Sequence, residues 1–109
     1  MRYCDSAFVF QRRTTREVTV GDPARGGVVM GGDRPVVVQS MITCDTMDTE
    51  ACVRETLDLV KVGCQIVRIT APTVKDAANL KNIVDALRAR DCWVPIVADI
   101  HFKPEAAME

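Results

Sequence analysis

Residues Val97 to Phe102 read Val-Ala-Asp-Ile-His-Phe, and this stretch decides how the rest of the chain is interpreted. Its apolar residues are typical of a buried strand, and its end carries an acid, Asp99, and the only histidine of the chain, His101. Side chains alternate along a strand, so Val97, Asp99 and His101 share one face. The pattern predicts a strand, Pro95 to Ile100, that delivers polar groups at its C-terminal end.

Two earlier apolar segments end in the same way. Pro35 to Met41 predicts a short strand buried on both faces, with Gln39 and Ser40 near its end. Cys64 to Thr70 predicts a second strand, interrupted by Arg68. Polar groups at the C-terminal ends of parallel strands mark the ligand-binding side of α/β barrels, and doubly wound sheets use the same end. The position of polar side chains along the strands therefore does not separate these two folds.

The segments between the strands have helical patterns. Asp48 to Val62 predicts a helix with Asp48 as N-cap, and Gly63 as the stop. A second helix begins after Thr73 and ends near Arg90, and a third begins at Pro104. Alternating strands and helices predict right-handed βαβ units and a parallel sheet. Ahead of them, residues 16–38 predict a short β-hairpin followed by the first strand, and residues 1–15 a loose leader.

Composition excludes several classes of protein. The net charge of −1 gives no reason to expect nucleic acid or an acidic membrane surface as a partner. No apolar run approaches the ~20 residues of a membrane span. Met1 to Phe10 makes a poor signal peptide, so we expect a cytoplasmic protein.

The cysteines argue for reduced thiols. The chain has 5 of them, an odd number, and none has Cys-x-x-Cys spacing, so neither a disulfide framework nor a zinc site is expected. Cys52 and Cys64 fit buried structural positions. Cys44 falls in an expected loop and is the one candidate neighbour of a site.

Arg68, Asp99 and His101 are the candidate site residues with the clearest chemistry. A buried guanidinium needs an anionic partner, which would be either Asp99 in an internal ion pair or the phosphate of a ligand. Both hold if Asp99 orients Arg68 until a ligand arrives. His101 is either a structural residue or a group that donates to phosphate, moves a proton or binds metal.

Other polar residues carry weaker signals. Gln39 and Ser40 are neutral donors of a kind common at strand ends. Thr43, Thr46 and Asp48 are interpreted mainly as caps and turn formers. No phosphate-binding loop, dinucleotide fingerprint or Ser-His-Asp pattern is present in the sequence.

Several segments together resemble the 4-hydroxy-3-methylbut-2-enyl diphosphate synthase family, also called GcpE. The similarity runs in order and with family spacing from about Arg12 to Glu109. The segments are Val38 to Met41, Asp45 to Ala51, Gly63 to Pro72, Asn79 to Ile83 and Pro95 to Phe102.

The resemblance implies a fold and an activity. It implies that residues 16–109 are the first three βα units of a TIM (β/α)8 barrel, with an iron–sulfur domain further downstream. The family reductively opens 2-C-methyl-D-erythritol 2,4-cyclodiphosphate to 4-hydroxy-3-methylbut-2-enyl diphosphate, an isoprenoid precursor of the non-mevalonate pathway. Its two electrons come from ferredoxin or flavodoxin through a 4Fe-4S cluster held by three cysteines and a glutamate. The resemblance also implies a homodimer.

Carried over to this chain, the family roles fall on the residues already singled out. Arg68 would bind the diphosphate, and Asp99 and His101 would line the substrate cavity and are the catalytic candidates. Gln39 and Ser40 would border the cavity.

Two departures from the family pattern limit this carry-over. Ile42 stands where the family usually has threonine, and none of the cysteines lies in a cluster-binding motif, so the metal ligands are expected outside the chain. We therefore expect the front portion of an enzyme, inactive by itself. The alternatives are another phosphate- or pterin-binding barrel, such as a dihydropteroate-synthase relative, and an inactive truncated product.

Overall fold

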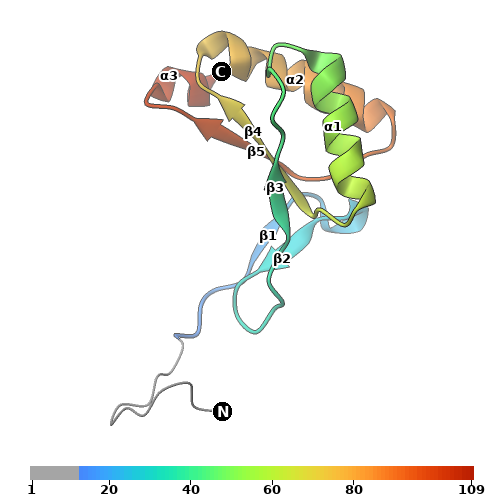
Figure 1. Ribbon diagram of the computed structural model, residues 1–109. Helices are drawn as coiled ribbons and strands as arrows, with labels where there is room; N and C mark the ends of the chain where they lie inside the picture. Colours follow the sequence, from blue (N-terminus) through green and yellow to red (C-terminus); the bar gives the residue numbers. More distant parts are fainter. Residues whose placement is uncertain (1–12) are drawn as a thin grey trace, which may run out of the picture.

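The computed structural model describes residues 13–109 (Figure 1). Most of the leader predicted for residues 1–15, together with Cys4, lies outside the described residues. The elements are β1 (Val18–Val20), the 3-10 turn η1 (Pro23–Arg25), β2 (Val28–Met30), β3 (Gln39–Met41), α1 (Thr49–Lys61), β4 (Ile66–Ala71), α2 (Val74–Ala89), β5 (Ile96–Ile100) and α3 (Pro104–Met108).

A three-stranded parallel sheet is the centre of the fold. Its strands lie in the order β3-β4-β5, so β4 pairs with both neighbours. Both crossover helices, α1 and α2, lie on the same side of this sheet and contact each other (Figure 1). The α/β alternation predicted from the sequence is therefore present.

The hydrophobic core lies between the sheet and these two helices. Val67, Ile69 and Ala71 point from β4 toward the helices and are fully buried. Ile83 and Leu87 of α2 meet them and are also fully buried. Each large apolar side chain removed from water in this way contributes about 1.5–3 kcal/mol, so β4 and the helices stabilise each other.

The first strand differs from its prediction. Only Gln39–Met41 pairs as a strand, and the expectation of burial on both faces from Pro35 to Met41 is wrong: Val36 is 90% exposed and Val38 54%. The physical reason is that β3 is an edge strand, with β4 on one side only. Val38 instead bonds the turn before β4, where its carbonyl accepts from the Gln65 amide at 2.8 Å.

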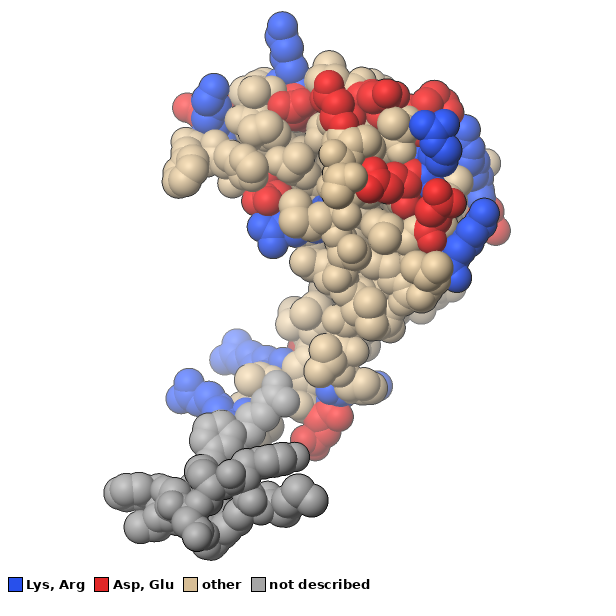
Figure 2. Space-filling view, in the orientation of Figure 1, with Lys and Arg blue, Asp and Glu red and all other residues tan. Residues whose placement is uncertain are grey.

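Local capping chemistry sets where the helices begin. The Asp48 carboxylate accepts from the Ala51 amide at 3.1 Å, as the predicted N-cap should. At α2 the Thr73 hydroxyl accepts from the Asp76 amide at 3.2 Å and donates to the Asp76 carboxylate at 2.6 Å, a side-chain variant of the capping box. In Figure 2 acidic side chains gather on the upper part of the displayed face, where α1 begins, and no continuous basic patch is visible there.

The segment before the sheet packs against its N-terminal end. Strands β1 and β2 pair antiparallel, with η1 between them. The Arg25 guanidinium of η1 lies 4.0 Å from the centre of the Trp93 ring, just before β5. Within residues 13–109, no helix is long and apolar enough to span a membrane.

Two glycines in the β1–β2 connection provide a matched test of this packing. Gly21 and Gly26 have nearly the same left-handed backbone, with φ of 85° and 84°. A Cβ on Gly21 would lie 2.7 Å from Pro95 Cγ, whereas a Cβ on Gly26 meets nothing within 4 Å. Gly26→Ala should therefore cost only the ~1–2 kcal/mol of a left-handed alanine.

Gly21→Ala should be more destabilising than Gly26→Ala by at least ~1 kcal/mol, because it adds a clash with Pro95 to the same backbone strain. Urea unfolding of the two variants measures the difference. Equal stabilities would show that the β1–β2 connection does not pack on Pro95 at Gly21.

Candidate functional site

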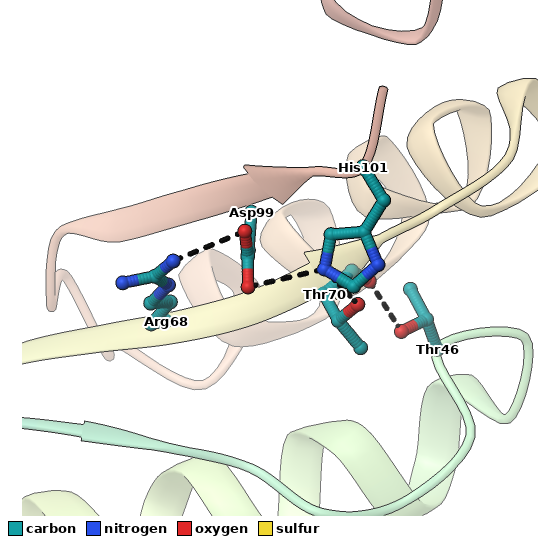
Figure 3. A network of polar contacts seen from close by, with 5 residues as sticks. All are labelled: Thr46, Arg68, Thr70, Asp99 and His101. Atoms are coloured by element: carbon teal, nitrogen blue, oxygen red, sulfur yellow. Dashed lines mark hydrogen bonds and ion pairs between the residues drawn. The ribbon is translucent and has the colours of Figure 1, made fainter. Parts of the chain in front are cut away.

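A chain of polar contacts joins the C-terminal ends of β4 and β5 (Figure 3). Arg68 Nη2 lies 3.0 Å from Asp99 Oδ1, and Asp99 Oδ2 lies 3.2 Å from His101 Nε2. The Thr70 hydroxyl lies 3.4 Å from the same histidine nitrogen. The three strongest sequence candidates are thus brought together, and the ion pair considered between Arg68 and Asp99 is present.

The register of the parallel strands produces this grouping. Thr70 of β4 lies beside Asp99 of β5, and Arg68 lies one alternate position earlier, so the three side chains share a face. This face is opposite the one that α1 and α2 cover, because the alternate residues Val67 and Ile69 are buried against the helices. The polar groups therefore lie on the open side of the sheet.

Arg68 is more accessible than the sequence suggested. Its side chain is 39% exposed, so the guanidinium is not fully buried, because both crossover helices among residues 13–109 lie against the other face of the sheet. Its Nε is nevertheless enclosed and has no hydrogen-bond partner within residues 13–109. The ion pair engages Nη2, which leaves donors of the fork for an incoming anion.

Asp99 is held as a carboxylate by its two neighbours. The hydrogen bond from Arg68, followed by that from His101, lowers the pKa of Asp99 below its usual value. With its hydrogen on Nε2, His101 donates to Asp99, which leaves Nδ1 outside these contacts and open to a ligand. The arrangement suits binding of an anion beside a group that can donate or accept a proton.

In the loop between β3 and α1, Thr46 makes contacts that go beyond the capping and turn-forming roles mainly expected for it from the sequence. The hydroxyl of Thr46 donates to the Thr70 carbonyl at 2.6 Å, and Asn79 of α2 donates to the Thr46 carbonyl at 2.8 Å. Thr46 is only 3% exposed, whereas a residue that merely forms a turn is usually at the surface. Its sequence neighbourhood gave no signal for this, since its partners lie 24 and 33 residues away.

Gln39 and Ser40 lie outside the polar network. Ser40 lies beside Val67, on the helix-facing side of the sheet, and Gln39 lies beside Ile66, at the start of β4. Neither makes a hydrogen bond to Arg68, Asp99 or His101 in the described structure. Their place at the border of a ligand cavity stays a prediction.

The cysteines of the described region behave as structural thiols. Cys44 Sγ lies 3.5 Å from Cys52 Sγ. Burial, followed by the hydrogen bond to Glu55, raises the pKa of Cys44 to about 12, so the nucleophilic thiolate is scarce at neutral pH. Among residues 13–109, no three His, Cys, Asp or Glu side chains come together as metal ligands would.

A cleft lies at the N-terminal end of the sheet, opposite the end that carries the polar network. This open cleft of about 1090 Å3 lies between η1 and the C-terminal ends of α1 and α2, and Trp93 forms part of its wall. Two of its cations already have partners: Arg25 lies 3.9 Å from Asp22, and Arg90 lies 3.6 Å from Glu50. We therefore place the candidate site at the polar network, where charge and proton-transfer groups converge.

Comparisons with known proteins agree on one family. Residues 15–109 match the family described as the GcpE TIM-barrel domain. The chain is 56% identical over 107 residues to the 4-hydroxy-3-methylbut-2-en-1-yl diphosphate synthase (flavodoxin) of Akkermansia muciniphila, covering 98% of this chain and 17% of that protein. It is 49% identical over 108 residues to the protein of the same name from Leptospira interrogans, covering 99% of this chain and 16% of the relative.

A relative whose name carries ferredoxin in place of flavodoxin is also similar. The 4-hydroxy-3-methylbut-2-en-1-yl diphosphate synthase (ferredoxin) of Parasynechococcus marenigrum is 49% identical over 90 residues, or 83% of this chain and 21% of that protein. The chain thus spans about a sixth to a fifth of the length of these relatives.

The pKa of Asp99 tests whether Arg68 holds it. Arg68→Ala removes the largest cause of the lowered pKa, so the carboxyl should titrate closer to its ordinary value of about 3.9. A lowered pKa stabilises the fold above the unfolded-state value, and this stabilisation is lost as the pH falls through the folded-state value. Arg68→Ala should therefore weaken the dependence of stability on pH in that acidic range.

Carboxyl 13C NMR titration of Asp99 measures this shift. Arg34→Ala, which breaks a 3.4 Å ion pair with Glu17 on the β1–β2 segment, is the control and should leave the Asp99 titration unchanged. The same Asp99 pKa in Arg68→Ala and the unmodified protein would contradict the assigned contact.

Proposed function

This chain belongs to the GcpE family, and we propose that it forms the first three strand–helix units of a TIM barrel within a longer polypeptide. Two observations support the barrel: the strands follow one another in sequence order, and both crossover helices lie on the same side of the sheet. The relatives' lengths support the longer polypeptide. Its proposed activity is reductive opening of 2-C-methyl-D-erythritol 2,4-cyclodiphosphate to 4-hydroxy-3-methylbut-2-enyl diphosphate.

The observation that carries this proposal is the Arg68–Asp99–His101 network at the C-terminal ends of β4 and β5. Barrel enzymes place their substrates at this end. A cyclic diphosphate needs cationic donors at one mouth, and Arg68 supplies a planar fork that fits phosphate oxygens.

Each residue of the network has a role in binding. Arg68 grips the diphosphate, and Asp99 holds the guanidinium in place by the 3.0 Å contact. His101, held through Nε2, presents Nδ1 toward the substrate, where Nδ1 accepts a hydrogen bond or a proton in the neutral imidazole and donates once the ring is protonated. Of the two residues predicted to border the cavity, Gln39 lies on the same face of the sheet as Arg68 and keeps that role, whereas the side chain of Ser40 faces the helices.

The described residues do not fit the iron–sulfur cluster of the family. A 4Fe-4S cluster takes four ligands, mostly cysteine thiolates, and the described region offers only the Cys44–Cys52 pair in contact. The ligands are therefore assigned to other parts of the longer polypeptide, and the present residues contribute substrate binding. Flavodoxin or ferredoxin as the electron donor, a homodimer and a cytoplasmic location are parts of the same proposal.

The alternatives raised from the sequence are less favoured. The similar proteins that we describe carry the diphosphate synthase name, and none of them is named for a pterin. Turnover by the purified longer polypeptide, with its cluster intact and a reduced flavodoxin or ferredoxin, tests the proposal directly. Formation of the hydroxymethylbutenyl diphosphate supports it, and no product from a cluster-loaded protein overturns it.

Arg68→Ala should weaken binding of the cyclodiphosphate to the longer polypeptide about 10- to 100-fold, since hydrogen bonds to charged groups contribute about 1.5–3 kcal/mol. Its effect on folding should be smaller, because the exposed side of Arg68 lies outside the core. Isothermal titration calorimetry and thermal unfolding measure the two effects separately.

Arg54→Ala is the matched control for Arg68→Ala. Arg54 lies exposed on α1, on the helix side of the sheet, and its loss should leave the affinity unchanged. Equal affinities of the Arg68→Ala and unmodified proteins for the cyclodiphosphate would refute the phosphate-binding role of Arg68.

A further inference from the structure

One carboxylate on α1 fixes the start of the β3–α1 loop. Glu55 Oε1 accepts hydrogen bonds from the Thr43 amide and the Thr43 hydroxyl, both at 2.9 Å. Its other oxygen accepts from the Cys44 amide at 3.2 Å. Two successive backbone N–H groups thus donate to a single side chain. Such contacts fix the backbone conformation of the loop.

The loop held by Glu55 leads directly into the candidate site. Before it, the Ile42 amide donates to the Arg68 carbonyl at 3.2 Å. After it, Thr46 bonds the Thr70 carbonyl at 2.6 Å, and the Thr70 hydroxyl lies 3.4 Å from His101 Nε2. The loop therefore bonds the backbone of β4 at Arg68, through Ile42, and at Thr70, through Thr46. Figure 3 shows the contact between Thr46 and Thr70.

We propose that Glu55 is a positioning residue of the candidate site, holding the β3–α1 loop so that Thr46 fixes Thr70 beside His101. Without the carboxylate, two backbone amides and a hydroxyl lose their acceptor and turn toward water. Thr46 then loses its fixed approach to Thr70. The effect of Glu55 on catalysis rests on the proposed function, whereas its effect on the loop does not.

The charge state of Glu55 agrees with this role. Burial alone would raise the pKa of Glu55, but hydrogen bonds from Cys44 and Thr43 outweigh it and lower that pKa. The side chain is therefore a carboxylate at neutral pH. Hydrogen bonds accepted by an ionised oxygen are stronger than those accepted by a neutral one.

The competing explanation is that Glu55 only stabilises the fold. A purely structural role reduces the fraction of folded protein, which lowers kcat and leaves KM unchanged. If Glu55 instead positions the site, its substitution weakens substrate binding and raises KM at nearly constant kcat. The division between KM and kcat therefore separates the two explanations.

Glu55→Gln is the test variant, since it keeps the length of the side chain, removes its charge and replaces one of the two acceptor oxygens with an NH2 group that cannot accept a hydrogen bond. Asp58→Asn is the control: Asp58 is an exposed acid on the same helix and accepts no side-chain hydrogen bond in the described structure. Hydrogen exchange by mass spectrometry on the longer polypeptide, without substrate, follows peptides covering residues 42–48 and 99–103. Steady-state kinetics with the cyclodiphosphate follow KM and kcat.

In Glu55→Gln, exchange in residues 43–46 should accelerate at least about tenfold, and KM should rise about fivefold or more with kcat within about twofold. Asp58→Asn should match the unmodified protein in both. Unchanged loop exchange overturns the inference, and so does faster exchange with an unchanged KM. If the unmodified protein has no turnover, the proposed function fails, and exchange in residues 99–103 decides: acceleration in Glu55→Gln supports the positioning role, and no change refutes it.

Discussion

Pairing of β4 with both of its neighbours is the constraint on which the rest of the structure depends. The register of β4 with β5 sets Thr70 beside Asp99, and its register with β3 sets Met41 beside Arg68. A slip of β4 by one residue would turn its polar side chains toward the helices. The fully buried Val67 and Ile69 oppose such a slip, because it would expose them on the open face. Core packing on one side of β4 therefore fixes the chemistry on the other.

The Arg68–Asp99 contact serves structure and binding at once. A partly exposed ion pair contributes little to the stability of the fold, typically ~1 kcal/mol or less. Stability alone therefore does not explain an arginine in the central strand of the sheet. As an orienting contact it has more effect, because it holds a flexible side chain in the geometry that an anion needs. The enclosed and unpartnered Nε of Arg68 is consistent with a site whose donors are not all satisfied by the described residues.

How much could be predicted from the sequence depends on the range of each interaction. The caps at Asp48 and Thr73 were predictable, because their partners lie within three residues. The grouping of Asp99 with His101 was predictable because residues two apart along a strand share a face. The Glu55 contacts were not predictable, since Thr43 lies 12 residues away and the bond depends on how α1 docks on the sheet.

The burial of the first strand was mispredicted for a related reason. Apolar Val36 and Val38 have the composition of a central strand, but β3 pairs on one side only, and the number of neighbours cannot be read from the segment itself. Helix and strand types, by contrast, agreed with their periodicity for α1, β4, α2 and β5, where the core of the described structure lies.

A crystal structure of the longer polypeptide with the cyclodiphosphate bound tests the central claim most directly. The account predicts diphosphate oxygens within hydrogen-bonding distance, about 3 Å, of the Arg68 guanidinium, with the substrate against His101. A diphosphate seated in the cleft beside Trp93, at the other end of the sheet, would contradict it.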